Sequence, residues 1–421
     1  LPGTNAKTGA ISNANSLWIQ YFYAYLNDTG RAGFVMASSA SDAGNKDRDI
    51  REKLVKTGHV DVMMAIGNKF FYTRSLPCTL WFFDKGKPQD LQDQVLMIDA
   101  RNVYHVVSAR SHIFTDEHHA NLNAIVWLYR GEQEKFIALV GRYQRHVDTW
   151  LAEIPARIAA DTAAIDRLAT QLQVFAQGAT LAELNNDQPD NAQLTQAQVD
   201  AFKAELEAMK ADTHVADIIA SLLTACTQAR AALARADLSS HAVQVALQAE
   251  FEALAPQLKA IGKTLEARHK QWLKLLDTAE KQLRARQSKT FDGKAAREAK
   301  RALLVADAKK NEDPTVRDAV LDALKQAVYY IHQTHWLHNR FPSARFEDVA
   351  GLCKAVTIDE IAANDYSLTP GRYVGVAAAS AVDEEDFVER LREIHDELAE
   401  LNDRAVELAG RIGRNFEELI G

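Results

Sequence analysis

Three consecutive aromatic residues, Phe70, Phe71 and Tyr72, follow the apolar run 60–66. An aromatic ring at the end of a strand offers a flat face on which a nucleic-acid base can stack. Aromatic residues at such a position also pack into the core or against a loop, and the residue types alone favour packing. We interpret Phe71 as a core residue, whereas Phe70 stays open to either role.

The densest positive charge lies in residues 281–310, which contain ten Lys/Arg and three Asp/Glu, a local net charge of +7. A basic helix in this segment could neutralise DNA phosphates and make binding depend on salt. A helix face that meets only solvent is the alternative, and Phe291, the one aromatic residue there, gives little support for stacking on single strands. The candidate DNA-binding residues are Lys281, Arg284, Arg286, Lys289, Lys294, Arg297, Lys300 and Arg301.

Three histidines, His332, His335 and His338, are spaced three residues apart, so neighbouring members can share one helical face. No carboxylate or cysteine stands in ligand register beside them, which favours packing or surface positions over a metal site. His118 and His119, at an expected helix start, have the same interpretation. The sequence contains no phosphate-binding loop, HExxH motif or Ser/His/Asp arrangement that would support hydrolysis.

The composition limits the class of protein. The chain has 421 residues, 47% hydrophobic and 25% charged, with a net charge of −8, which predicts two or three folded domains and excludes a uniformly basic nucleic-acid coat. Its three cysteines, Cys78, Cys226 and Cys353, are too far apart for a disulfide framework or a zinc motif, so we expect a reducing, cytoplasmic location. No apolar run approaches the roughly 18–20 residues that a membrane span needs.

Residues 1–128 have the pattern of an α/β domain. Helical spacing of apolar residues predicts helices over 16–26 and 49–57. Short apolar runs that alternate with helices predict a parallel sheet with an antiparallel pair at its edge. The four expected strands are 33–37, 60–66, 76–83 and 95–98.

Residues 129–340 are poor in Gly and rich in Ala, Leu, Gln, Glu and Lys. Apolar residues recur at intervals of three and four, which predicts long helices packed as hairpins or as a coiled-coil arm. The expected helices are 143–172, 198–234 and 241–304, with breaks at 188–190, 237–240 and 313–314.

The C-terminal part divides into a connecting segment, 341–380, and a final helix, 381–421. Apolar residues of this helix alternate four and three apart, which is the heptad spacing of a coiled-coil seam. A narrow seam stabilises a solitary helix very little, so we expect it to pack on a partner or on the 129–340 arm. The seam residues are Phe387, Leu391, Ile394, Leu398, Leu401, Ala405, Leu408 and Ile412.

Several segments, in family order, resemble the modification (M) subunit of type I restriction–modification systems, an N6-adenine DNA methyltransferase family. The last of these segments is very characteristic of that subunit, and the resemblance covers about 1–131 and 340–421. The similar segments are 30–36 (GRAGFVM), 50–54 (IREKL), 67–73 (GNKFFYT), 76–85 (LPCTLWFFDK), 114–117 (FTDE), 125–131 (IVWLYRG), 358–361 (IDEI) and 364–374 (NDYSLTPGRYV).

This resemblance implies half of a Rossmann-like methyltransferase sheet, a long helical insertion and a C-terminal assembly helix. It implies that the intact enzyme transfers a methyl group from S-adenosylmethionine to adenine N6 in DNA, while a separate specificity subunit selects the sequence. The implied partners are DNA, the specificity subunit, a second modification subunit and, as a further candidate, the restriction subunit. Phe70 matches the position of an aromatic residue that lies against the flipped target base. The residues implied to contact the specificity subunit are Leu391, Ile394, Leu398, Leu401 and Leu408.

Two motifs of the family are absent from this sequence. One is the Gly-rich turn that binds S-adenosylmethionine, and the other is the catalytic tetrapeptide, Asn or Asp followed by Pro-Pro and an aromatic residue. In relatives the tetrapeptide lies shortly before a segment that resembles residues 1–3. We therefore expect the chain to correspond to the part of the subunit after the catalytic motif, and to be inactive alone.

Two alternatives remain open at this point. One is a noncatalytic helical scaffold derived from a methyltransferase, and the other is an RNA methyltransferase. Codons for the catalytic tetrapeptide upstream of Leu1 would favour the enzyme, whereas a start codon there would favour the scaffold. In all three cases we expect Arg372 and Tyr373 of the characteristic motif to pack back on the α/β domain.

Overall fold

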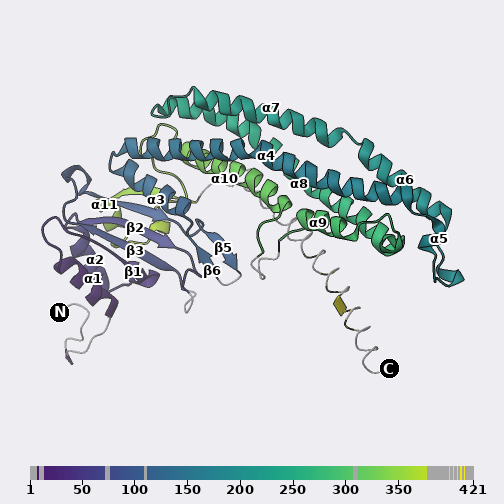
Figure 1. Cartoon of the computed structure of the whole chain (residues 1–421). Coiled ribbons are helices and arrows are strands. Elements are labelled where there is room, and N and C mark those ends of the chain that lie inside the picture. Colours follow the sequence, from purple (N-terminus) through teal and green to yellow (C-terminus); the bar gives the residue numbers. More distant parts are fainter. Residues whose placement is uncertain are drawn as a thin grey trace. The chain divides into compact units, whose positions relative to one another are not determined.

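The structure, a computed structural model, describes residues 7–8, 14–71, 76–108, 111–306, 312–376 and positions 398, 402, 405, 408, 409 and 412. The chain divides into two compact units, one made of residues 1–113 and 348–421 and the other of residues 114–347 (Figure 1). The first is an α/β unit that the second, helical unit interrupts in sequence. The divisions fall at 113–114 and 347–348, where the sequence predicted boundaries near 128 and 340.

A five-stranded sheet in the order β1-β3-β2-β4-β7 forms the centre of the α/β unit. A two-stranded ribbon, β5-β6, forms a separate small sheet. The strands are β1 (Arg31–Ala37), β2 (Val60–Ile66), β3 (Cys78–Asp84), β4 (Gln94–Asp99), β5 (His105–Ser108), β6 (Ser111–Ile113) and β7 (Cys353–Thr357). The helices and 3-10 turns are α1 (Ala14–Ala24), η1 (Ser38–Ser41), α2 (Lys46–Val55), η2 (Gln89–Leu91), α11 (Ile358–Ala363) and η7 (Pro370–Arg372).

The four strands predicted from the N-terminal segment all form, but the prediction of a largely parallel sheet is wrong. Only β2 and β4 pair in parallel, and the other three pairings in the sheet are antiparallel. Among the described residues between β2 and β3 there is no helix, and β3 returns beside β2 in the opposite direction. The sheet is therefore mixed.

Strand β7 was not predicted, and it joins the sheet from the far side of the helical unit in sequence. It pairs antiparallel with β4, from Gln94 opposite Thr357 to Ile98 opposite Cys353. One face of the sheet is covered by α1 and α2 (Figure 1), whose Ile19, Ile50 and Leu54 pack in one buried cluster with strand residues. Segments before and after the helical unit thus share one core.

The helical unit consists of long helices joined by short connections. The longer helices are α3 (Asp116–Tyr129), α4 (Gln133–Gly178), α6 (Gln196–Ala211), α7 (His214–Ala234), α8 (His241–Asp277), α9 (Gly293–Leu303) and α10 (Val316–Arg340). Short helical segments of three to five residues are α5 (Leu181–Leu184), η3 (Asp190–Ala192), η4 (Thr278–Gln282) and η5 (Ala285–Gln287).

Two of the three predicted long helices are interrupted. The single helix predicted over 198–234 is wrong, because Asp212 leaves the helical conformation and its Oδ1 accepts a hydrogen bond from the His214 backbone N–H at 2.9 Å. Such a local bond competes with helix continuation. The single helix predicted over 241–304 is also wrong, since Arg284 adopts a left-handed conformation and Asp292 caps a new helix, α9.

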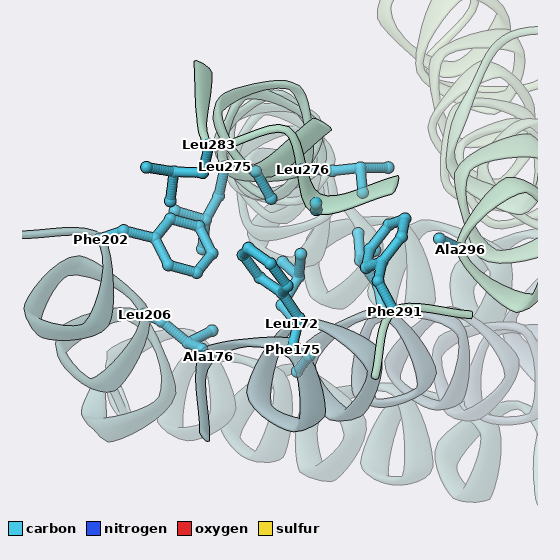
Figure 2. Packing of buried hydrophobic residues seen from close by; sticks show 14 of the residues in the cluster. Leu172, Phe175, Ala176, Phe202, Leu206, Leu275, Leu276, Leu283, Phe291 and Ala296 are labelled. Carbon is cyan, nitrogen blue, oxygen red and sulfur yellow. The ribbon is translucent and has the colours of Figure 1, made fainter. Parts of the chain in front are cut away.

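These breaks allow the helices to fold back and form two buried clusters. One joins α4, α7, α8 and α10. In the other, drawn in Figure 2, Phe175 of α4 lies edge-on to Phe202 of α6 and to Phe291, with ring centroids 5.8 Å apart in both pairs. Aromatic pairs prefer this geometry, and each buries a large apolar area. The segment 278–292 is therefore held by its own apolar side chains.

Removing the Phe175 ring should destabilise the helical unit. Phe175 is 1% exposed, and truncation of a buried phenylalanine to alanine costs about 3–5 kcal/mol. We expect Phe175→Ala to lower the free energy of unfolding by that amount in urea denaturation. Val174→Ala, one residue earlier at a 46% exposed position, should change it by about 0.5 kcal/mol or less. Equal effects of the two variants would contradict the packing described.

Candidate functional site

The carboxyl ends of β1, β2 and β4 lie at one edge of the sheet, which in open α/β sheets is where ligands bind. The chain segments that leave β2 and β4 run close together there. The Ala100 backbone N–H donates to the Ala65 carbonyl at 2.9 Å. A side chain at Gly67 would lie 3.0 Å from the Arg101 carbonyl oxygen, so this close approach favours glycine.

An aromatic cluster fills this edge. The rings of Tyr104 and His112 stack at a centroid distance of 4.1 Å, with planes 4° apart. Phe70 meets both rings edge-on, at 6.5 Å from Tyr104 and 6.2 Å from His112. The His112 backbone N–H donates to the Lys69 carbonyl at 3.0 Å, which ties the ribbon to the segment after β2. Phe70 is therefore half-buried in a fixed orientation.

The prediction that Phe71 belongs to the core is wrong. Its side chain is 40% exposed, whereas Phe70 takes the packed position. Lys69 adopts a left-handed conformation, with φ of 68°, so the chain turns immediately before the two phenylalanines. This turn gives their side chains different surroundings. Tyr72 lies outside the described residues.

An ion pair borders the aromatic cluster. Arg101 donates from Nε to Asp99 Oδ1 at 2.8 Å and from Nη2 to Oδ2 at 2.5 Å. Hydrogen bonding to this carboxylate raises the pKa of Arg101. A side chain at Gly371 would lie 2.9 Å from Arg101 Nη2, so the C-terminal motif reaches the same edge. Segments from three parts of the sequence thus meet here.

The characteristic motif packs back on the α/β unit, as predicted. Tyr366 is anchored because Arg51 Nε donates to its carbonyl at 2.8 Å, and the Leu368 N–H donates to the Ser41 carbonyl at 2.8 Å. Burial raises the pKa of Tyr373 to about 12, in keeping with a structural role. Arg372 pairs with Asp42 at 2.8 Å.

The carboxyl group of Asp42, which pairs with this motif, has a shifted pKa. Burial acts to raise the pKa of Asp42, but hydrogen bonds from Ser367 and Arg372 outweigh it and lower the pKa. Both Arg372 and Asp42 are about half exposed, so their pair stabilises the contact only slightly. The motif is held mainly by its buried residues.

The model of the N-6 DNA Methylase family matches residues 4–144 and 291–382, more than half of the chain. The chain belongs to this family. It is 42% identical over 106 residues to the type I restriction enzyme MjaIX methylase subunit of Methanocaldococcus jannaschii, which covers 25% of this chain and 19% of that protein. It is 33% identical over 105 residues to the HindI methylase subunit of Haemophilus influenzae, covering 25% and 22%. The matched stretch spans about a fifth of the length of these relatives.

Two solved structures of type I methyltransferase subunits are similar to a small part of this chain. The methyltransferase subunit of a type I system from Streptococcus thermophilus is 26% identical, covers 27% of this chain and 24% of that one, and has a TM-score of 0.25. The EcoKI M protein is 23% identical, covers 28% and 26%, and has a TM-score of 0.24. At these TM-scores the similarity supports no conclusion about the arrangement of the chain.

The family match omits residues 145–290. This stretch begins within α4 and ends just before Phe291. It lies inside the long helical insertion that the sequence predicted for 129–340.

The predicted basic helix over 281–310 is wrong in part, because the segment is interrupted and several of its cations are engaged. Lys281 and Lys300 both pair with Asp277, at 3.0 and 2.9 Å. Arg284 donates to the backbone carbonyl oxygens of Leu184 and Ala192, so it fixes the connection between α5 and α6.

Of the remaining cations of this segment, one is paired with a carboxylate and the others are exposed. Arg286 pairs with Glu280 at 2.9 Å. Lys294, Arg297 and Arg301 are exposed along α9, opposite its buried residues, and they are the residues of the segment best disposed to meet a phosphate backbone. Lys289 is exposed before this helix, whereas Lys309 and Lys310 lie outside the described residues.

The histidines singled out in the sequence lie at packing or surface positions. His335 Nδ1 lies 2.6 Å from Glu252 Oε1, and His338 is buried with its ring edge-on to His241 at 5.4 Å. His118 completes a capping box with Thr115 at the start of α3. Within the described part of the chain, no group of three His, Cys, Asp or Glu side chains could hold a metal ion.

The C-terminal seam is described only in part. Leu398, Leu408 and Ile412 are exposed by 62%, 56% and 60%. Leu391, Ile394 and Leu401, together with Phe387, lie outside the described residues. Among the helices of the described ranges, none is both long and apolar enough to cross a membrane.

The buried His338 should make the helical unit sensitive to acid. Burial, helped by the field of His241, lowers the pKa of His338 from 6.5 to about 4. Below pH 6.5 the unfolded chain takes up a proton that the folded chain excludes, so stability falls with pH, by about 2 kcal/mol between pH 7.5 and 5. We expect His338→Phe to remove this part of the pH dependence of urea unfolding.

The matched control is His332→Gln, at an exposed position of the same helix. It should leave the pH dependence of unfolding as in the wild type. An unchanged pH dependence in His338→Phe would show that another group causes the acid sensitivity.

Proposed function

We propose that this chain is part of a type I modification subunit, an enzyme that transfers a methyl group from S-adenosylmethionine to adenine N6 in DNA. The observation that carries the proposal is the convergence of both family-matched stretches, 4–144 and 291–382, on one sheet edge. Phe70 of the first stretch and Gly371 of the second lie at that edge, beside the pair Asp99–Arg101.

The reaction explains why an aromatic residue is needed there. The adenine amine is a poor nucleophile while its lone pair is conjugated with the ring, so the base must leave the duplex and be held for attack. Stacking of a base on an aromatic side chain contributes about 1–3 kcal/mol. Phe70 is presented by a fixed cluster and is only half-buried, which supports its role as the stacking residue.

The methyl donor needs residues that this chain does not contain. The Gly-rich turn and the Asn/Asp-Pro-Pro-aromatic tetrapeptide are absent from the sequence. In the described part of the chain, β1 is an edge strand of the sheet, so its outer backbone groups are open to a further strand. We therefore assign S-adenosylmethionine binding to a donor-binding segment that pairs along β1, and we expect no methyl transfer by the chain alone.

Exposed aromatic residues of α1, the helix that packs beside β1, support the assignment of a further segment along β1. Trp18, Tyr21 and Tyr25 are exposed by 56%, 44% and 85% along one stripe of α1 and the turn after it. Val35, on β1, is exposed by 47%. Apolar surface of this kind marks an interaction site more often than free surface.

The exposed seam of the last segment supports a second assignment, to the specificity subunit. Leu398, Leu408 and Ile412 follow the heptad pattern and are exposed to solvent in the isolated chain. Partner helices would bury these side chains. DNA, a second modification subunit and the restriction subunit complete the set of proposed partners.

A noncatalytic scaffold is the second candidate function. The observation that favours it is the long helical stretch 145–290, which lies outside the family match. A scaffold needs neither a donor site nor an extruded base. The formation of N6-methyladenine separates the two functions.

The decisive experiment joins this chain to a donor-binding segment of the family and measures N6-methyladenine in duplex DNA. Phe70→Ala should lower kcat/KM by about 5- to 150-fold, which corresponds to the loss of about 1–3 kcal/mol of stacking. Phe70→Tyr and Phe70→Trp should be milder because they keep a ring. Phe71→Ala, at the exposed neighbouring position, should be close to wild type.

Two results would contradict the proposal in different ways. Equal activity of Phe70→Ala and Phe71→Ala would contradict the stacking role of Phe70 but not the proposed methyltransferase activity. No N6-methyladenine from the joined protein, with the specificity subunit still bound, would support the scaffold.

Charge in the C-terminal seam should release the specificity subunit. Leu398→Asp with Leu408→Asp would place carboxylates in an apolar interface, at a cost of several kcal/mol. We expect loss of co-purification with no change in thermal unfolding, since both positions are exposed in the chain alone. Asn402→Asp adds one negative charge at an exposed position off the seam and should bind normally. Retained co-purification of the double variant would contradict the assignment.

A further inference from the structure

The β5–β6 ribbon exposes aliphatic side chains that the proposed function does not use. Val106, Val107 and Ile113 are exposed by 47%, 57% and 44%. The ribbon is not hydrogen-bonded into the five-stranded sheet. A two-stranded ribbon gains little stability by itself, so exposed aliphatic residues on it need another explanation.

The base of the ribbon is anchored in the aromatic cluster. His112 pairs with Val106 in the ribbon, stacks on Tyr104, and donates its N–H to the Lys69 carbonyl. Val107 is the extra residue of a bulge, since Val106 pairs with His112 and Ser108 pairs with the preceding residue, Ser111. Bulges re-aim side chains and often lie next to active sites. The two valines therefore project from a rooted element beside Phe70.

Charge favours nucleic acid as the partner. The segments 67–77 and 100–115 contain four Lys/Arg and no Asp or Glu, although the whole chain has a net charge of −8. Lys69 and Arg101 belong to the described part of these segments. Asp99, just outside these segments, pairs with Arg101, so Lys69 is the described cation that could contact a phosphate, and each neutralised phosphate releases counterions.

The size of the ribbon also fits. The four residues of β5 span about 13 Å at the usual rise of a strand. The major groove admits a two-stranded ribbon and is about 8.5 Å deep. The valines are its second and third residues, so Val107 lies about 7 Å along the strand from His105, close to the depth of the groove.

We infer that the β5–β6 ribbon enters the duplex beside the extruded base, with Val106 and Val107 filling the space that the target adenine leaves in the stack. This inference rests on the proposed function, because only an extruded base leaves such a space. Apolar side chains that enter a base step cover the base faces that unstacking exposes. The ribbon is a positioning element, since it touches the duplex and not the reacting amine.

The test compares the affinity of the full chain for two short duplexes, one intact and one with an abasic site, by fluorescence anisotropy at fixed salt. In the abasic duplex the space already exists, and opening one costs a few kcal/mol in the intact duplex. We expect the wild-type chain to prefer the abasic duplex by about tenfold or more. Val106→Ser with Val107→Ser should reduce this preference to about one, and Val107→Ser alone should reduce it in part.

Two control variants separate this contact from others. Val305→Ser changes a valine that is 59% exposed in the helical unit and should keep the full preference. Lys69→Gln should weaken binding to both duplexes equally, because a phosphate contact does not sense the abasic site. Thermal unfolding of each variant checks that the exposed substitutions leave the fold intact.

The outcomes distinguish this inference from the proposed function. Loss of the preference in the valine variants, without N6-methyladenine from the joined protein, would show that the ribbon contacts the duplex and would reject the methyltransferase. A wild-type preference in the valine variants, with Phe70→Ala still impaired in methylation, would reject the ribbon alone. Equal binding of the two duplexes by the wild-type chain, or no binding to either, would also reject the inference about the ribbon. Loss of a protein partner in the valine variants, with unchanged DNA binding, would reject it as well.

Discussion

Strand β4 is the element on which the α/β unit depends, because it pairs with β2 on one side and with β7 on the other. Its residues 95–99 are buried, so an unpaired backbone group there would be costly. β7 follows the helical unit in sequence. The chain before residue 114 and the chain after 347 must therefore meet to complete the sheet, whatever is inserted between them.

The same pairing creates the end of the sheet where the candidate functional site lies. β2 and β4 run in parallel, so the segments that follow them leave from one side of the sheet and pack against each other. This packing fixes the aromatic cluster of Phe70, Tyr104 and His112, and the ribbon is rooted in that cluster. Gly371 of the C-terminal motif lies close to the Arg101 side chain, so sequence-distant segments share one small surface.

The helical unit shows how a long insertion can be held without help from the sheet. Its helices bury two apolar clusters of their own. In a buried pair, Nε2 of His269 on α8 lies 2.5 Å from Oδ1 of Asp161 on α4, which joins the two helices at one register. A slip of either helix would leave one of these polar groups buried without its partner, so the pair favours a single arrangement.

The sequence by itself determined the local elements and the family, because apolar periodicity, turn residues and short motifs are properties of neighbouring residues. It located β2 without error. Only the tertiary structure decided that the sheet is mixed, that Phe71 is exposed, that Arg284 binds carbonyl oxygens, and that His112 stacks on Tyr104. Each of these depends on which distant segments meet, and a pattern of neighbouring residues carries no information about that.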